Sequence, residues 1–184
     1  MKKSLLSEYN ITRKTGIKAL TLEQGDEICS VIVNDDCCVG MLTARGQFVI
    51  CESRGVRPIG RVARGVRGIK LNEGDYLISA NKIPKNTKEI ISVSEKGYIK
   101  KTPISDFNIT NRDVKGSKIH NLKDENDKLV AFLPISNESD VIVVANNAQI
   151  KIKLSEVALL GKGAQGTKSM KISNNAKIIG MTIF

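Results

Sequence analysis

The chain consists of short apolar runs separated by polar turns, and no run keeps the 3.6-residue period of a helix. Residues 28–33 and 141–144 are examples: both are rich in Ile and Val, and both lie between Asn, Asp or Gly residues. Short runs of β-branched residues bounded by turn residues are typical of strands. The pattern therefore predicts an all-β protein.

Pairs of these runs recur as candidate hairpins. The first run of each pair covers residues 39–43, 90–94 and 141–145, and a turn follows at Gly46, Gly97 or Ala148. The second runs cover 47–50, 98–101 and 149–152. A polar and apolar tail follows two of them, at 102–107 and 154–157, and the N-terminal residues 4–9 have the same form. Three hairpins of one kind indicate an internal repeat.

A glycine-centred frame repeats with the same period. Its anchors are 49, 51 and 50 residues apart, at Gly16, Gly65, Gly116 and Gly166. An aspartate follows three of them at a similar distance, at Asp26, Asp75 and Asp127, where we expect a turn. A propeller blade has four strands in about 50 residues, which matches this repeat. A single four-stranded sheet must pack against a neighbouring sheet to bury its apolar face.

We therefore predict one propeller-like domain over residues 1–184, with about four blades. The frame is out of phase with both ends of the sequence. Residues 1–9 match the tail of a repeat, and the sequence stops 18 residues after Gly166, before a further hairpin. The expected array is either a fragment of a larger one or a ring that closes imperfectly.

Charge adds a partner to this picture. The chain has 29 Lys and Arg against 19 Asp and Glu, which gives a formal net charge of +10. This surplus favours a polyanion, chiefly nucleic acid, with an anionic membrane as the competitor. Aromatic residues make up only 4% of the chain and Trp is absent, so stacking platforms for single strands are scarce. Double-stranded DNA held by its phosphates is the predicted partner.

The basic residues keep the register of the repeat. A basic residue stands two positions after each anchor, at Lys18, Arg67, Lys118 and Lys168, and others precede the anchors. Stacked repeats place equivalent residues on one rim, where they would neutralise phosphates and offset the cost of bending DNA. The candidate DNA-binding residues are Lys18, Arg54, Arg57, Arg61, Arg64, Arg67, Lys70, Lys100, Lys101, Arg112, Lys115, Lys118, Lys162 and Lys168.

Catalytic chemistry is not predicted. The sequence has no P-loop, no G-x-S-x-G and no metal-ligand spacing, and its only histidine, His120, is interpreted as a structural residue in a strand. We expect no catalytic residue, no metal and no cofactor. The cysteines Cys29, Cys37, Cys38 and Cys51 are expected to be reduced thiols. Without an export signal or a long apolar span, a cytoplasmic location is expected.

Two segments carry a family resemblance. Residues 60–75, GRVARGVRGIKLNEGD, and residues 97–107, GYIKKTPISDF, resemble the C-terminal repeats of type IIA topoisomerase A subunits, above all those of DNA gyrase. The resemblance implies a β-pinwheel, in which neighbouring blades exchange strands and DNA bends around the basic perimeter. It also implies a nucleoid location and two protein partners, the N-terminal region of the A subunit, which carries the catalytic tyrosine, and the ATP-hydrolysing B subunit.

Three alternatives stay open at this point. The heptapeptide that marks gyrase (Gln, two Arg, two Gly, Lys, Gly) is absent, and residues 111–116 and 161–166 are only degenerate echoes of it. The parent could therefore be gyrase, which supercoils DNA, or topoisomerase IV, whose domain tunes substrate choice. A propeller that serves as a protein-interaction scaffold is the alternative from another class.

Overall fold

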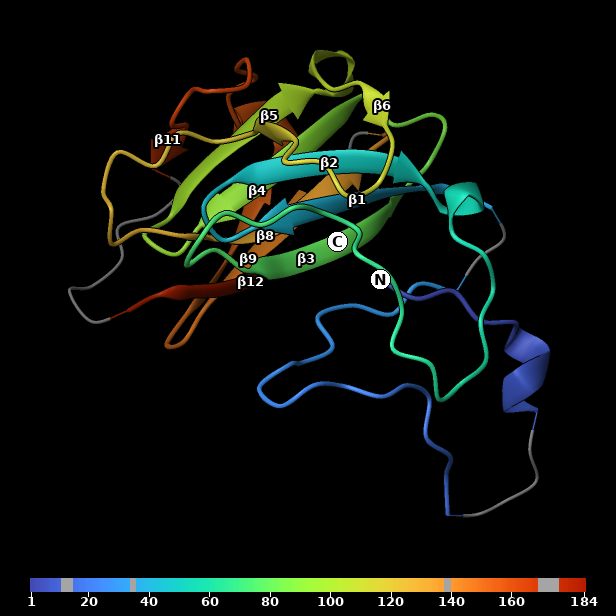
Figure 1. Ribbon diagram of the computed structural model, residues 1–184. Coiled ribbons are helices and arrows are strands. Elements are labelled where there is room, and N and C mark those ends of the chain that lie inside the picture. The colour runs from blue at the N-terminus through green and yellow to red at the C-terminus, as the bar shows by residue number, and fades with distance from the viewer. Residues whose placement is uncertain (11–14, 34–35, 138–139, 169–175) are drawn as a thin grey trace.

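The computed structural model describes residues 1–10, 15–33, 36–137, 140–168 and 176–184, and it is all-β (Figure 1). The three expected hairpins are present and antiparallel. Their strands are β1 (Cys38–Thr43) with β2 (Gln47–Glu52), β4 (Glu89–Ser94) with β5 (Tyr98–Pro103), and β9 (Asp140–Ala145) with β10 (Gln149–Lys153).

Each hairpin receives a strand from the repeat that follows it. The added strands are β3 (Leu77–Ile83) on β1, β8 (Leu129–Ile135) on β4, and β12 (Ile178–Ile183) on β9. β3 and β12 both lie against β8, so these three strands bring neighbouring blades together. The strand exchange that the resemblance implied is therefore present.

A short fourth strand completes two of the sheets. β7 (Ser117–Lys118) pairs antiparallel with β2, and β11 (Thr167–Lys168) pairs antiparallel with β5. A further short strand, β6 (Ile109–Thr110), lies parallel to the far end of β2. A complete blade thus combines a hairpin, a strand from the next repeat and an edge strand from the repeat after that.

The anchor glycines are required where these edge strands begin. Gly116 and Gly166 have φ of 76° and 87°, a region that side chains disfavour. A Cβ on Gly116 would overlap the Phe48 carbonyl oxygen, and one on Gly166 would lie 2.7 Å from that of Ile99. The recurring glycine therefore lets the edge strand approach the hairpin.

The three expected tails form single turns of 3₁₀ helix, η1 (Leu6–Tyr9), η3 (Ile104–Asp106) and η4 (Leu154–Glu156). A fourth such turn, η2 (Ser53–Gly55), follows β2 and was not expected. The residue after η3, Phe107, is buried and packs edge-to-face on Phe48 with ring centroids 5.0 Å apart. Phe132 of β8 packs on Phe48 at the same separation. Burying such rings contributes about 2–3 kcal/mol each, so this cluster joins the first two hairpins.

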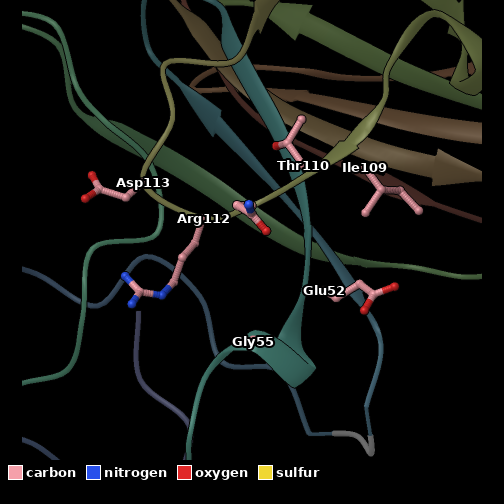
Figure 2. Close-up of a pocket in the computed structure, with 7 residues that line it drawn as sticks. Glu52, Gly55, Ile109, Thr110, Arg112 and Asp113 are labelled. Atoms are coloured by element: carbon pink, nitrogen blue, oxygen red, sulfur yellow. The ribbon is translucent and has the colours of Figure 1, made fainter.

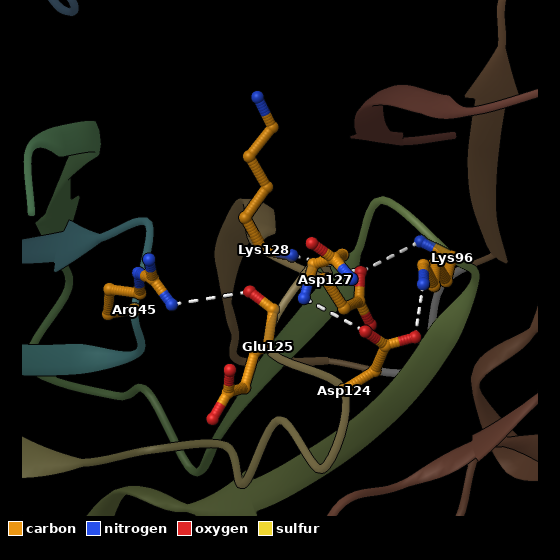
Figure 3. Close-up of polar contacts among 7 residues, drawn as sticks. Arg45, Lys96, Asp124, Glu125, Asp127 and Lys128 are labelled. Atoms are coloured by element: carbon orange, nitrogen blue, oxygen red, sulfur yellow. Dashed lines mark hydrogen bonds and ion pairs between the residues drawn. The ribbon is translucent and has the colours of Figure 1, made fainter.

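Each recurring aspartate follows a turn, as expected, and two of them, Asp75 and Asp127, also cap a hairpin turn. The Asp75 Oδ1 accepts hydrogen bonds from the Arg45 and Tyr76 N–H groups, at 3.0 and 2.9 Å. Asp127 does the same for Lys96 and Lys128, at 3.0 and 2.9 Å (Figure 3). Each carboxylate joins a hairpin turn to the entry of the strand added beside it.

Two expectations about strands were wrong. Residues 28–33 do not form a strand, and Val31 and Val33 are 79% and 75% exposed. The reason is pairing. The Ser30 hydroxyl donates to the Ala80 carbonyl of β3, but within the described residues the segment forms no backbone ladder with a strand, and an unpaired strand cannot satisfy its backbone. His120 lies in a bend two residues after β7 instead of in a strand. Of the fourth glycine frame, residues 169–172 lie outside the described residues.

Candidate nucleic-acid interface

Two of the four periodic cations lie in edge strands of the sheets, whereas Lys18 and Arg67 are exposed and lie outside the strands. Lys118 belongs to β7 and Lys168 to β11, and both side chains are exposed. Arg67 is their counterpart at the N-terminal end, because the N–H of the preceding Val66 donates to the Met1 carbonyl at 2.8 Å. Lys118 and Lys168, which share a position in the sequence repeat, therefore lie at equivalent positions on successive blades.

Most of the other predicted cations are exposed. Arg61 is half-buried, whereas the exposed ones are Lys18, Arg54, Arg57, Arg64, Lys70, Arg112, Lys115 and Lys162. Three of the arginines have an acidic neighbour: Arg64 contacts Glu23 at 2.6 Å, Arg54 contacts Asp36 at 3.5 Å, and Arg67 contacts Asp113 at 3.5 Å. Exposed ion pairs of this kind contribute at most about 1 kcal/mol, so a phosphate can replace the carboxylate.

Two predicted contact residues do not face solvent, and the prediction for them needs correction. Lys100 is fully buried, and its Nζ donates to the Gly161 carbonyl at 2.8 Å. Burial lowers the pKa of Lys100 to about 8, and the nearby Asp106 carboxylate partly opposes this shift. The Lys101 side chain is 14% exposed and pairs with Glu89 at 3.1 Å. Burial of Lys100 and the pairing of the largely buried Lys101 with Glu89 keep both ammonium groups from serving as exposed phosphate contacts.

A hollow of about 760 Å³ lies beneath the basic loop that leads to β7 (Figure 2). The loop supplies Asn111, Arg112 and Asp113 to its lining, and Gly55 at the end of η2 lies across from them. Asp113 has a φ of 63°, the position that Gly163 occupies with a φ of 86° in the loop leading to β11. The two loops thus share a residue of positive φ at the same position, but they differ in the residues and the space beneath them.

A buried polar pair behind the second loop was not predicted. The Ser92 hydroxyl and the His120 Nδ1 are 3.1 Å apart, and both side chains are fully buried. Burial lowers the pKa of His120 to about 4; the charge of Lys100 acts in the same direction, and the backbone of Gln165 partly opposes both. Burial of a histidine in a turn has no periodic signature, so the sequence alone could not reveal this pair.

The four cysteines are unpaired thiols, as expected, and burial raises the pKa of Cys51. Within the residues described, no three His, Cys, Asp or Glu side chains are grouped as metal ligands. Over the same residues, no helix is long and apolar enough to cross a membrane.

Exchanged strands, short edge strands and basic edge loops define the class of this protein: it is a β-pinwheel, whose sheets are not closed into a ring. Residues 1–35, 41–84, 88–136 and 150–184 match the family described as the DNA gyrase C-terminal domain, beta-propeller. The chain belongs to this family.

Relatives and solved structures agree with this assignment. The DNA gyrase A subunit of Staphylococcus epidermidis is 31% identical over 179 residues, and that of Chlamydia pneumoniae is 30% identical over 185 residues. These matches cover 95% and 98% of the chain but only 20% and 22% of the relatives, so the chain spans about a fifth of their length.

Two solved structures share the fold. A DNA gyrase A C-terminal domain matches with a TM-score of 0.85 and 26% identity, over 93% of this chain and 59% of that one. The C-terminal domain of a DNA topoisomerase IV matches with a TM-score of 0.92 and 22% identity, over 99% of this chain and 58% of that one. The gyrase domain and the topoisomerase IV domain therefore support the same architecture for this chain.

Proposed function

We propose that this chain binds double-stranded DNA and bends it around its basic rim, without catalysing a reaction itself. The observation that carries the proposal is that Lys118 and Lys168 lie in the edge strands of successive blades, with the exposed Arg67 at the corresponding position beside Met1. One cation per blade at the perimeter forms a curved row, and a curved row of positive charge matches a bent phosphate backbone.

The energetics favour such a complex. Each phosphate that is neutralised releases counterions, which drives binding at low salt. Bending a 20–30 base-pair segment costs about 1–6 kcal/mol, and contacts with further blades offset that cost. The edge loops also contain Gly60, Gly65, Gly116 and Gly166, so backbone N–H groups can approach phosphates closely.

In the complete enzyme, the bent DNA would be presented to a type IIA topoisomerase for strand passage. The partners in that role are the B subunit together with the N-terminal region of the A subunit, while the location is the nucleoid. Membership in the gyrase family supports a role in supercoiling. The second candidate is a topoisomerase IV type of substrate selection, which the shared fold with a topoisomerase IV C-terminal domain supports.

A topological assay separates these roles. A nicked plasmid is incubated with increasing amounts of the protein and ligated, and the shift in linking number is read on a gel. A shift that grows with protein concentration supports chiral wrapping and a gyrase type of role. Binding without a shift supports simple bending, as expected for the second candidate. If duplex DNA is not bound even at low salt, the proposal is wrong and the interaction-scaffold alternative replaces it.

A further inference from the structure

The loop at residues 161–166, which leads into β11, is held by hydrogen bonds to β5, η3 and residue 121, and its own Lys162 Nζ also donates to the Asp106 backbone carbonyl at 3.1 Å. The Lys100 Nζ donates to the Gly161 carbonyl at 2.8 Å, and the Lys162 N–H donates to the Asp106 Oδ2 at 3.1 Å. The Asn121 N–H donates to the Ala164 carbonyl, also at 3.1 Å. Two of these bonds use side chains of β5 and η3, so their presence depends on residue type and not only on the fold.

The lysine bond recurs at the N-terminal end. Gly65 lies against the Met1 carbonyl and the Lys2 Cβ just as Gly166 lies against the Ile99 carbonyl and the Lys100 Cβ. Lys2 therefore occupies the position of Lys100. Its Nζ donates to the carbonyl of Arg61, in the basic loop before Gly65. Two basic loops are thus restrained by a lysine at the equivalent position, Lys100 in β5 and Lys2 in a segment without a strand.

The loop at residues 111–116 is the exception. The strand registers place Val49 where the second blade has Lys100, and Gly55 where it has Asp106. Neither residue can donate or accept a side-chain hydrogen bond there. Gly55 instead lines the hollow beneath this loop (Figure 2). Two equivalent loops therefore differ in the restraints beneath them.

The restraint comes at an energetic cost. Opposite Lys100 on β4 lies Ser92, and its counterpart in the first blade, opposite Val49, is the buried Met41. Burying an ammonium group is unfavourable unless it is bonded, and an apolar side chain of similar size would be more stable. The first blade shows that an apolar residue fits at this place in the sheet. Lys100 is therefore not required for packing.

We infer that Lys100 and Asp106 are positioning residues, which clamp the 161–166 loop and thereby fix where Lys162 and Lys168 meet a DNA phosphate; the exposed Lys162 Nζ would exchange its bond to the Asp106 carbonyl for the phosphate. The DNA part of this inference rests on the proposed function, whereas the clamp itself does not. A loop that is ordered before binding loses less conformational entropy when the ligand arrives. The clamped loop should therefore contribute more to affinity than its cations alone.

Amide hydrogen exchange of the full chain tests the clamp without DNA. The variants are Lys100→Met, which removes the donor and keeps the stem, and Asp106→Gly, which installs the first-blade residue. We expect exchange at residues 161–166 to rise about tenfold in both, with residues 111–116 unchanged. Asp106→Asn retains an acceptor oxygen and should stay close to wild type. Lys85→Met, an exposed lysine outside the rim, is the matched control.

A transplant covers the case in which a variant fails to fold. Val49→Lys with Gly55→Asp introduces the clamp beneath residues 111–116, and exchange there should slow. If Lys100→Met unfolds, Asp106→Gly and its Asn counterpart decide the matter. Unchanged exchange at 161–166 in every folded clamp variant would overturn the inference, as would a failure of Asp106→Asn to protect the loop.

DNA affinity is the second readout. Lys100→Met and Asp106→Gly should bind duplex DNA about three- to tenfold more weakly, because the loop must be ordered on binding. The salt slope should stay at the wild-type value, since neither residue touches a phosphate. A reduced slope for Lys100→Met would show direct contact and overturn the positioning role. If the wild-type chain binds no DNA, the proposed function fails, and the exchange data alone decide whether the clamp exists.

Discussion

At the scale of single residues, the second blade is unusual because it buries polar and ionisable side chains. Ser92, Lys100 and His120 are all fully buried in or behind its sheet. A buried imidazole of this kind stays neutral, because the charged form would lose its hydration. The folded state therefore resists protonation, which makes its stability sensitive to acid.

We predict that His120 causes part of the acid destabilisation of this protein. Its pKa is about 4 in the folded chain and near 6.5 when unfolded, so the unfolded state binds more protons between these values. Its contribution is complete above pH 6.5 and is lost as the pH falls toward 4. Chemical denaturation from pH 7 to 4 should show that wild type loses about 2–4 kcal/mol more than His120→Ile.

The control for this prediction is a residue of the same cluster that does not titrate, Ser92→Ala. That variant should keep the wild-type pH dependence, whatever its effect at pH 7. Parallel curves for wild type and His120→Ile would contradict the prediction.

The residue scale also shows what the sequence could not provide. Lys100 and Lys118 are both lysines in apolar, glycine-bounded segments, and their local patterns are alike. They differ because Lys118 lies in an edge strand, whereas Lys100 lies in β5, an inner strand that pairs with both β4 and β11. The loop that accepts the Lys100 hydrogen bond is 61 residues away, and local pattern does not reveal such a partner.

At the scale of elements, the edge strands depend on the conformation of the preceding glycine. β7 and β11 are two residues long, so one glycine determines whether each strand can pair at all. The hairpins were predictable because their apolar runs and turns are adjacent in sequence. The exchanged strands were not predictable from pattern alone, since β3 and residues 28–33 look alike in sequence but only β3 has a hairpin to join.

We predict that Gly116→Ala destabilises the protein by about 2–4 kcal/mol, because a positive φ and a backbone clash add together. The new Cβ would overlap the Phe48 carbonyl oxygen, which forces β7 away from β2. Gly74→Ala is the matched control. Its φ is 69° but no atom lies within 4 Å of the added Cβ, so only about 1 kcal/mol is expected. Thermal unfolding measures both; equal losses would contradict the role of close approach.

We also predict that Asp127→Ala costs about 2–3 kcal/mol, since two backbone N–H groups lose a charged acceptor. Asp26 is the counterpart in the first repeat and is exposed, so Asp26→Ala should change stability by less than about 0.5 kcal/mol. Urea denaturation compares the two variants. A similar loss in both would show that the aspartates act through net charge instead of through the turn.

At the scale of the whole molecule, the surplus of positive charge is distributed by the repeat. Arg61, Arg64 and Arg67 come from one glycine frame, and the periodic positions of the next two frames lie at the edges of their sheets. A row of this kind binds through the number of phosphates that it neutralises, more than through any single residue. Salt dependence is therefore the property that reports on the rim.

We predict that changing Arg61, Arg64 and Arg67 together to Ala weakens duplex binding and flattens its salt slope by about 0.9 for each phosphate that the variant no longer neutralises. The control is the triple change of Lys82, Lys85 and Lys88 to Ala, which removes the same charge from exposed positions on and after β3. Fluorescence anisotropy over a salt series distinguishes the two. A slope that falls equally in both variants would reject the rim as the contact surface.

The exchanged strands also determine the order in which the blades can fold during synthesis. While the chain leaves the ribosome, the β1–β2 hairpin emerges first, but its sheet must await residues 77–83 and then residues 117–118. Each blade can therefore complete its sheet only after the next one or two repeats have been synthesised. Until then, the nascent protein has an incomplete sheet with unpaired strand edges, which are the sites where a second chain could pair with it.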